Sequence, residues 1–419
     1  MKNLFVLLLT VAALPMMSEP LMSEDWTPQQ DVAKAQGLAV SGRTLELFTH
    51  GVKSEWGYAK PQQDTFVVVH PKVARQQAPL YVVLHSAGHD VISCVKCTAK
   101  VGDHDIYHSP EDFYALYLDC RANQGDWWWG GMHAKDANLT KKNSGGEPMP
   151  VERRVIDTVK WAIATYGIDP ERVYLCGNSM GGSGTLGIGL RNGDLFAAIK
   201  ANVPAGIEHV SQRMFFPPMS MPATLTLADP PVVVDYSAPN DGWAFGHERF
   251  VAAMEERKYA LYFYWGPFGH ANNSVAIMQV NDLINSFAWL EVKRNQAYAV
   301  FTKASCNSKI PWPDQLKETA PGQVNAFFRW KNVSDAPDKL VMSLFLTTSG
   351  DLKTKFTIPT QANADVSLRR LQKLKVKPGE ALRWTFGAAR GEVTADASGL
   401  ITIPGLTITA DPTTLTIAK

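Results

Sequence analysis

Short apolar segments that alternate with helical segments constrain the fold of this 419-residue chain more than any other feature of its sequence. The clearest is Leu80-Tyr-Val-Val-Leu84, which has a large apolar or aromatic side chain at every position. Such a run is typical of a strand that is buried on both faces, as in a parallel sheet. Further strands are predicted at residues 38–50, 64–70, 113–119, 172–176, 197–202, 231–236 and 260–265.

Two other segments have the spacing of helices. Apolar side chains recur through residues 151–166 at helical intervals, and Gly167 is a typical residue to end such a helix. Residues 275–293 predict a long amphipathic helix. Because strands that alternate with helices form parallel sheets covered on both faces, we expect an α/β domain over residues 23–302.

The pattern changes after Arg294. Residues 322–419 alternate apolar and polar side chains, as in Val341-Met-Ser-Leu-Phe-Leu346 and Phe356-Thr-Ile358, and threonine is abundant. These features predict an antiparallel β-sandwich of about 100 residues as a second domain. The proline-containing stretch 303–321 is predicted to link the two domains.

The chain begins with a segment that has the layout of a secretory signal peptide. Lys2 provides a positive charge, the apolar run Leu4–Ala13 follows, and small residues offer cleavage points. The run is shorter than a membrane-spanning helix, and no later stretch of the sequence reaches that length. We therefore expect residues 1–22 to be removed from a secreted or periplasmic protein that has no membrane partner.

Charge and cysteine content narrow the classes of function. The formal net charge is +1, which argues against a nucleic-acid partner because such proteins carry clustered excess Lys and Arg. The pattern Cys94-x2-Cys97 followed by His104-x3-His108 resembles a zinc finger, but six residues separate its halves where about 12 are usual. We expect no metal and no cofactor. Export permits disulfides, yet five cysteines leave at least one unpaired, and Cys176 in an apolar strand is the expected free thiol.

A glycine-rich turn follows the predicted strand 172–176. Its residues Gly177-Asn-Ser-Met-Gly181 fit the pattern Gly-x-Ser-x-Gly. In this pattern the serine sits on a sharp turn between a strand and a helix, and the flanking positions must be small so that the backbone can pass closely. The turn therefore predicts Ser179 as a nucleophile.

The oxygen that becomes negative when Ser179 attacks needs hydrogen-bond donors. One is expected from the N–H of Met180, the residue after the nucleophile. The other is expected from the loop after the first apolar strand, which reads His85-Ser-Ala-Gly-His89. We favour the N–H of Ala87 and keep that of Ser86 as the alternative.

A serine hydroxyl attacks when a base takes its proton. Three histidines follow Ser179 in the sequence, namely His209, His247 and His270. His270 is the expected base, because it follows the last predicted parallel strand and precedes the predicted final helix.

The base in turn needs an acid that orients it. Asp241 is the expected acid because it lies in the turn Ala238-Pro-Asn-Asp-Gly242, at the carboxyl end of a predicted strand. Loops at such strand ends carry function in parallel sheets. Asp235 within the strand and Asp229 before it are the alternatives.

These segments together resemble the α/β-hydrolases, and among them the secreted feruloyl-esterase and polyhydroxybutyrate-depolymerase-like branch. The resemblance covers about residues 60–293. It is carried by Leu84-His-Ser-Ala-Gly88, Gly177-Asn-Ser-Met-Gly-Gly182, Asn240-Asp241, Gly269-His270 and the lead-in Trp161 to Arg172. The resemblance implies the α/β-hydrolase fold, the chain order serine, acid, histidine, and the hydrolysis of esters. The C-terminal region lies outside it.

Trp127, Trp128 and Trp129 follow a predicted strand and are expected to form a platform for a sugar or an aromatic acyl group. The alternative is that this insertion packs its tryptophans against the sheet, and at least one is core in either case. The expected function is that of a secreted serine carboxylic ester hydrolase acting through an acyl-enzyme on Ser179, on acyl esters of plant polysaccharides or related small esters. A prolyl-oligopeptidase-like serine peptidase and a non-catalytic carbohydrate-binding protein are the alternatives.

Overall fold

The structure of the protein is a computed structural model that describes residues 26–51, 53–60, 64–120, 127–130, 146–271, 275, 277–278, 280–312 and 320–419. The expected signal peptide, residues 1–22, and most of the insertion 121–150 lie outside the described residues.

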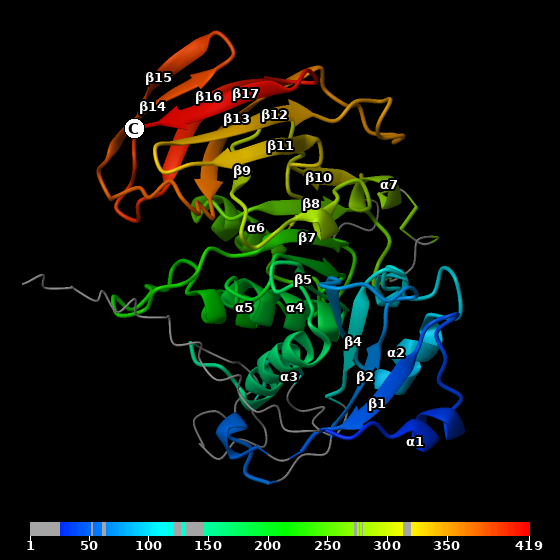
Figure 1. Ribbon diagram of the computed structural model, residues 1–419. Coiled ribbons are helices and arrows are strands. Elements are labelled where there is room, and N and C mark those ends of the chain that lie inside the picture. Colours follow the sequence, from blue (N-terminus) through cyan, green and yellow to red (C-terminus); the bar gives the residue numbers. More distant parts are fainter. Residues whose placement is uncertain are drawn as a thin grey trace, which may run out of the picture.

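A mostly parallel sheet forms the centre of the larger part of the molecule (Figure 1). Its nine strands are β1 (Leu45–Thr49), β2 (Thr65–Val69), β3 (Leu80–Leu84), β4 (Tyr114–Leu118), β5 (Val173–Asn178), β6 (Ala198–Asn202), β7 (Val232–Ser237), β8 (Leu261–Trp265) and β10 (Gly322–Val324). They lie in the order β1-β2-β4-β3-β5-β6-β7-β8-β10. The strands from β4 to β8 in that order are parallel, and β1, β2 and β10 pair antiparallel at the edges. This is the α/β-hydrolase fold, which confirms the predicted fold class.

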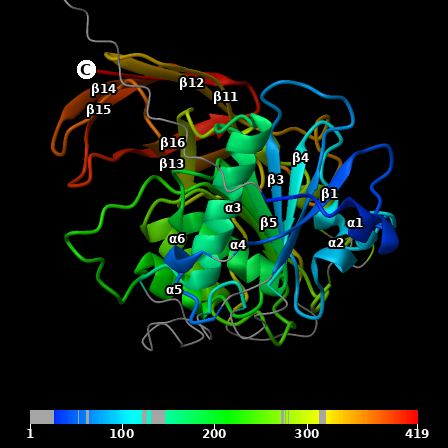
Figure 2. The ribbon, with the colours of Figure 1, turned by 60° about the horizontal axis from the view of Figure 1, so that its bottom comes forward.

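Helices cover both faces of this sheet (Figures 1 and 2). One face carries α3 (Pro150–Tyr166), α4 (Met180–Arg191), α5 (Glu208–Met214) and α6 (His247–Glu256). The other carries α2 (Val91–Cys97), α7 (Asn281–Ile284) and the 3-10 segments η2 (Asp105–Tyr107) and η5 (Trp289–Glu291). Near the N-terminus lie α1 (Gln30–Ala35) and η1 (Ser54–Trp56). α3 matches the helix predicted at 151–166, and Gly167 ends it in the left-handed conformation, at φ 60°.

The apolar runs of the sequence are the central strands. Every residue of β3, β5, β6, β7 and β8 is buried, because helices cover both faces of the sheet there. The glycines of α4 let this helix lie close to the sheet: a Cβ on Gly189 would lie 2.8 Å from Ile199 Cγ2. This packing holds the first residue of α4 at the carboxyl end of β5, next to Ser179.

The C-terminal part is a β-sandwich, as the alternating pattern predicts (top of Figure 1). One sheet has the order β11-β12-β17-β14-β15 and the other β16-β13-β9. The strands are β9 (Tyr298–Thr302), β11 (Phe328–Asp335), β12 (Lys339–Leu346), β13 (Gln361–Arg369), β14 (Ala381–Phe386), β15 (Ala389–Thr394), β16 (Ile401–Thr409) and β17 (Thr413–Ala418). Side chains of both sheets, such as Met342 and Val366, share one core.

Residues 356–358, part of the alternating pattern, form no strand. Phe356 and Ile358 pack against the sandwich core, but their backbone joins neither sheet. The alternation of apolar residues indicates which side chains face the core, and this segment packs its half-buried side chains there without ladder hydrogen bonds.

Two strands cross the domain boundaries expected from the sequence. β9, expected at the end of the first domain, pairs with β13 of the sandwich, and β10, expected in the second domain, pairs with β8 of the central sheet. Side-chain patterns do not indicate which sheet a strand joins, because pairing depends on context distant in the sequence. Within the expected linker 303–321, Trp312 is buried and stacks on His247 with ring centroids 5.2 Å apart.

The long helix predicted over residues 275–293 is wrong. Among the described residues of this stretch, α7 has only 4 residues and the short turn η5 follows it. The hydroxyl of Ser286 donates to the backbone oxygen of Leu283, and local side-chain bonds of this kind compete with helix formation. Phe287 and Trp289 still bury their side chains against the sheet, which accounts for the amphipathic pattern.

Candidate active site

Ser179 occupies a strained turn between β5 and α4. Its backbone has φ 55° and ψ −114°, a left-handed conformation that side chains rarely adopt. The glycines on either side are required by close backbone contacts. A Cβ on Gly177 would lie 2.3 Å from the backbone oxygen of Gly181, and a Cβ on Gly181 would lie 2.0 Å from that of Leu84. The turn therefore presents the Ser179 hydroxyl at the end of the sheet, as the sequence pattern indicates.

The structure brings Ser179, His270 and Asp241 together. His270 Nε2 lies 2.7 Å from Ser179 Oγ, and His270 Nδ1 lies 2.6 Å from Asp241 Oδ2. The Asp241 side chain is 1% exposed and that of His270 33% exposed, so a buried carboxylate supports a histidine that faces solvent. This is the geometry of a nucleophile, a base and an orienting acid.

Two loops at the carboxyl edge of the sheet hold the acid and the base. Asp241 follows β7, and its Oδ1 accepts a hydrogen bond of 2.9 Å from the Trp243 N–H. His270 follows β8, and the Gly269 N–H beside it donates to Asn240 Oδ1 at 2.9 Å. The two loops are therefore fixed to each other as well as through the Asp241–His270 contact.

The alternative acids lie elsewhere. Asp235 on β7 is fully buried and faces His247 Nε2 at 3.6 Å, and burial raises the pKa of Asp235 above its ordinary value. Asp229 accepts a hydrogen bond of 2.6 Å from Arg369, which connects the sandwich to the central-sheet part.

The alternative histidines are part of the core. His247 stacks on Trp312, as described above. His209 is buried between backbone oxygens of Gly206 and Ser183, and its burial lowers its pKa to about 4. Neither ring is placed against Ser179.

The expected oxyanion donors lie on neighbouring segments. The contact of Gly181 with Leu84 described above sets the start of α4 against the end of β3, so Met180 and the loop 85–89 are adjacent. The Ser86 N–H donates to Tyr107 Oη at 2.9 Å, which removes the alternative donor. Across the described residues, neither the Met180 N–H nor the Ala87 N–H donates to a protein group, and Ala87 is exposed. The expected donors therefore differ from the Ser86 N–H, which has a protein acceptor.

Several residues that support the oxyanion loop were not identified from the sequence. The His85 ring is buried, and it accepts the Cys120 N–H at Nε2, at 3.0 Å. Its Nε2 also lies 3.1 Å from Asp119 Oδ1 at the end of β4. Tyr107 holds Ser86 from η2. The only sequence signal for these roles is that polar residues directly follow buried strands, which does not say what they contact.

The three tryptophans do not form one platform. Trp128 is fully buried and its Nε1 donates to the His85 backbone oxygen at 2.9 Å, so its assignment to substrate binding is wrong. Its side chain fills the space that glycine leaves at position 184, where a Cβ would lie 2.4 Å from Trp128 Cβ. Trp127 and Trp129 are half-buried, with ring centroids 6.1 Å apart, and Trp129 stacks on His209 at 4.4 Å.

An exposed aromatic pair beside Asp241 was also missed. Trp243 is 57% exposed and Phe245 58% exposed. The Gly206 N–H donates to the Trp243 backbone oxygen at 3.3 Å, and a Cβ on Gly206 would lie 3.9 Å from Trp129 Cζ2. Because the Ala205 N–H donates to the Ser179 backbone oxygen at 3.1 Å, this short segment joins the aromatic residues to the nucleophile. The signal in the sequence was two aromatic residues, Trp243 and Phe245, within four positions after the acid.

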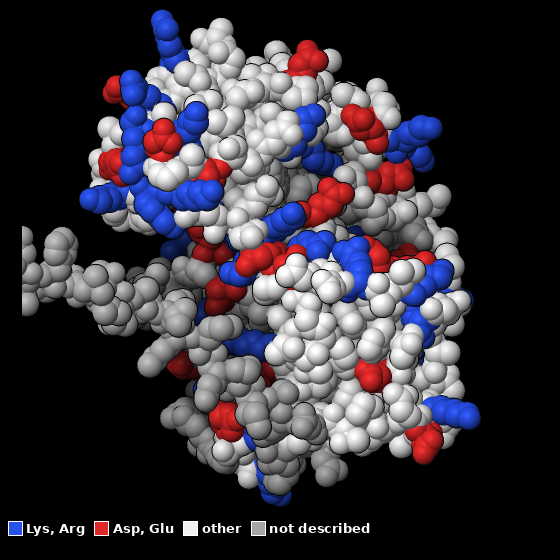
Figure 3. Space-filling model, in the orientation of Figure 1, with Lys and Arg blue, Asp and Glu red and all other residues white. Residues whose placement is uncertain are grey.

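The surface charges, the helices and the cysteines can be compared with what the sequence predicts for them. On the face shown in Figure 3, acidic and basic side chains are interspersed and gather along the junction of the sandwich with the central-sheet part. None of the helices in the described ranges combines the length and apolar character needed to cross a bilayer. All five cysteines are free thiols.

No protein-family model and no curated protein matches the chain. Similar solved structures include an S-formylglutathione hydrolase from Agrobacterium tumefaciens, with 13% identity, a TM-score of 0.41 and coverage of 58% of this chain and 94% of that chain. A fluorophosphonate-binding serine hydrolase from Staphylococcus aureus has 11% identity, a TM-score of 0.40 and coverage of 59% and 98%. A ferulic acid esterase has 13% identity, a TM-score of 0.39 and coverage of 56% and 95%. Likeness at this level carries no conclusion about activity, which is inferred from the site.

Proposed function

We propose that this chain is a serine hydrolase that cleaves carboxylic esters through an acyl-enzyme on Ser179. The observation that carries the proposal is the hydrogen-bonded series Ser179 Oγ, His270 and Asp241, with contacts of 2.7 Å and 2.6 Å. It stands at a strained turn where both flanking glycines are required by backbone contacts. Strain of this kind is characteristic of functional sites.

The reaction follows from this arrangement. Ser179 Oγ attacks the ester carbonyl carbon while His270 Nε2 accepts its proton, and Asp241 stabilises the imidazolium. His270 then gives that proton to the departing alcohol oxygen as the bond between it and the carbonyl carbon breaks. A water molecule attacks the acyl-enzyme with His270 again as base, which releases the acid and restores the hydroxyl.

The Met180 and Ala87 N–H groups are the proposed oxyanion donors. Backbone donors that are already oriented stabilise the negative oxygen without reorganisation during the reaction. Removal of one such donor lowers kcat by about 10²- to 10³-fold in serine hydrolases. Backbone groups are not removed by simple substitution, so the scaffold around them offers the practical test.

For the substrate we propose an acyl ester of a plant-type polysaccharide or a related small ester. The support is the exposed aromatic surface formed by Trp243 and Phe245 beside Asp241, together with half-buried Trp127 and Trp129. Aromatic faces in an open site suit flat apolar faces of a large ligand. A secreted or periplasmic location, proposed from residues 1–22, agrees with a polymeric substrate.

The test is labelling and turnover by the purified full chain. A fluorophosphonate should label one site stoichiometrically, peptide mapping should place it on Ser179, and Ser179→Ala should remain unlabelled. Feruloyl, acetyl and short aliphatic esters should be hydrolysed, and a peptide anilide should not.

Each contrary result has a defined meaning. Turnover of the peptide anilide at a higher kcat/KM than any ester would replace the proposal with a serine peptidase. If the folded protein is neither labelled nor active and yet binds an oligosaccharide, the chain would be a carbohydrate-binding protein and not an enzyme.

A further inference from the structure

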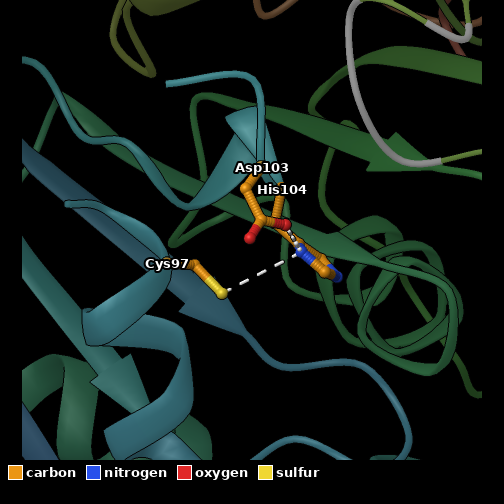
Figure 4. A group of neighbouring side chains, drawn as sticks. All are labelled: Cys97, Asp103 and His104. Atoms are coloured by element: carbon orange, nitrogen blue, oxygen red, sulfur yellow. Dashed lines mark hydrogen bonds and ion pairs between the residues drawn. The ribbon is translucent and has the colours of Figure 1, made fainter. Parts of the chain in front are cut away.

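A second cluster of reactive side chains lies beside the oxyanion loop. Cys97 ends α2, and Asp103 and His104 directly precede η2. One potential ligand atom from each residue lies within 4.8 Å of the other two. Figure 4 shows the three side chains pointing toward one another from these two elements.

The spacing of these atoms is close to that of a metal site. Cys97 Sγ lies 3.9 Å from His104 Nδ1, which lies 2.7 Å from Asp103 Oδ1. Tetrahedral zinc, with Zn–S of about 2.3 Å and Zn–N and Zn–O of about 2.0 Å, separates S and N by about 3.5 Å and N and O by about 3.3 Å. The S–N separation would therefore shorten by about 0.4 Å and the N–O separation would lengthen by about 0.6 Å, which opens the Asp103–His104 contact to admit the ion. The Cys97 sulfur and the Asp103 oxygen already lie within 4.8 Å of each other.

The donor set selects the class of metal. Thiolate, imidazole and carboxylate are the ligands that Zn²⁺ takes in proteins, whereas Ca²⁺ and Mg²⁺ prefer oxygen alone. Cys97 is a free thiol and is half-buried. The side chains of Asp103 and His104 are 34% and 12% exposed, so the cluster lies near the surface and is partly covered.

We propose that Cys97, Asp103 and His104 bind one Zn²⁺ ion, with water as the fourth ligand. On binding, the Cys97 thiol releases its proton to solvent and coordinates as a thiolate. Asp103 coordinates through a carboxylate oxygen and neutral His104 through the lone pair of Nδ1. Three protein ligands with one open position is a recognised zinc arrangement.

This cluster differs from the zinc-finger-like pattern in the sequence. Cys94 is 1% exposed and belongs to the core between α2 and the sheet, and His108 is outside the group. Asp103, which the spacing pattern does not include, contributes instead. Only half of that pattern therefore converges in space, so its spacing was no guide to the ligands.

The ion would join two elements that support the oxyanion loop. α2 begins directly after this loop with Asp90 as its N-cap, and Tyr107 of η2 accepts the Ser86 N–H. His89 of the loop lies with its ring centroid 4.6 Å from that of His104. We therefore expect bound zinc to raise the unfolding temperature, whether or not the chain is an esterase.

Cobalt provides the direct test, since Co²⁺ bound to a thiolate gives a charge-transfer band in the near ultraviolet. The reduced, chelator-treated full chain is titrated with Co²⁺ and then with Zn²⁺. The band should saturate at about one equivalent, and Zn²⁺ should abolish it. Cys97→Ser should remove the band and weaken Zn²⁺ binding at least about 100-fold, because even changes behind the ligands cost about 10- to 100-fold.

Three further variants keep the test decisive. Asp103→Asn preserves size and the thiolate, so it should retain the band but bind Zn²⁺ more weakly. Cys306→Ser, at another half-buried free thiol, and His108→Ala, from the zinc-finger-like pattern, should behave as the parent. The proposal fails if the parent shows no band, if the band survives Cys97→Ser, or if Cys306→Ser removes it. Fluorophosphonate labelling of each variant reports separately on Ser179.

Discussion

The indole Nε1 of Trp128 donates a hydrogen bond of 2.9 Å to the backbone oxygen of His85. Trp128 is fully buried, and His85 begins the loop that carries Ala87. The bond thus connects residues 127–130 to the oxyanion loop through the interior of the protein. Of three adjacent tryptophans, the middle one is scaffold and positions the backbone around the proposed donor.

Trp128→Phe should leave the His85 oxygen without this donor. We expect the free energy of unfolding to fall by about 1–3 kcal/mol, the effect of one unsatisfied buried polar group. Ester kcat should fall more than KM changes, because the oxyanion loop loses a support. Urea unfolding and steady-state kinetics measure the two effects. Trp127→Phe, at a half-buried neighbour, is the control and should change stability by less than about 1 kcal/mol; equal effects of both variants would contradict the assignment.

Asp241→Asn should separate orientation of the base from substrate binding. The amide cannot hold His270 in the same tautomer, so kcat should fall by about 10³- to 10⁴-fold while KM changes little. Asp235→Asn is the matched control and should leave kcat within about tenfold, since Asp235 faces His247 and not His270. The reverse ranking of the two variants would transfer the acid role to Asp235.

Gly181→Ala tests the close contact under the nucleophile. The new Cβ would lie 2.0 Å from the Leu84 backbone oxygen. Because the obstructing atom belongs to the backbone, it cannot move aside as a flexible side chain would. We expect a loss of about 3 kcal/mol or more in the free energy of unfolding. Gly242→Ala is the control, because no atom lies within 4 Å of its Cβ position and its φ is outside the left-handed region. A Gly181→Ala protein as stable as Gly242→Ala would show that the turn is not as tight as described.

Lys200 should make stability depend on pH in the alkaline range. This lysine on β6 is buried, with Asn285 Oδ1 at 3.0 Å, and burial lowers its pKa from 10.5 to about 8. Between these values the unfolded chain binds more protons than the folded one, so the Lys200 contribution to stability rises with pH. Below pH 8 Lys200 is protonated in the folded state, and the full free-energy cost of a buried cation lowers the stability.

The corresponding variant is Lys200→Met. Its stability relative to the parent should be greatest near pH 7 and decline by up to about 3 kcal/mol by pH 10.5. Urea unfolding of both proteins at intervals between pH 7 and pH 10.5 gives the difference curve. A difference that stays constant over this range would show that Lys200 does not titrate as a buried group.

Trp243→Ala should change selectivity between esters that share an acyl group. More than half of the indole is exposed beside Asp241. We therefore expect KM to rise about tenfold for an ester whose alcohol part is a sugar, which corresponds to a loss of about 1.4 kcal/mol in binding free energy. The ethyl ester of the same acid should keep its KM, which makes it the internal control. If KM rises equally for both, Trp243 affects the loop and not the alcohol subsite.

Local chemistry explains why so much of the central sheet was predicted. β3 spans the residues predicted for it, and α3 begins one residue earlier than predicted. The agreement is close because continuous burial and helical periodicity are visible in residues that are neighbours in the sequence. The partners of each strand were not predicted. β9 and β10 each join the sheet of the other part, because pairing is settled by contacts between distant segments.

The amino-acid pattern alone places Ser179 at a strand-to-helix turn, because the glycines around it are required only where a backbone passes closely. It also placed Asp241 and His270 on loops after consecutive parallel strands. That these three residues meet is a result of folding, since His270 lies 91 positions from Ser179 and 29 from Asp241. The burial of Trp128 and the convergence of Cys97, Asp103 and His104 are results of folding as well. Burial and convergence depend on which surfaces pack together, a property of the folded chain that no local pattern contains.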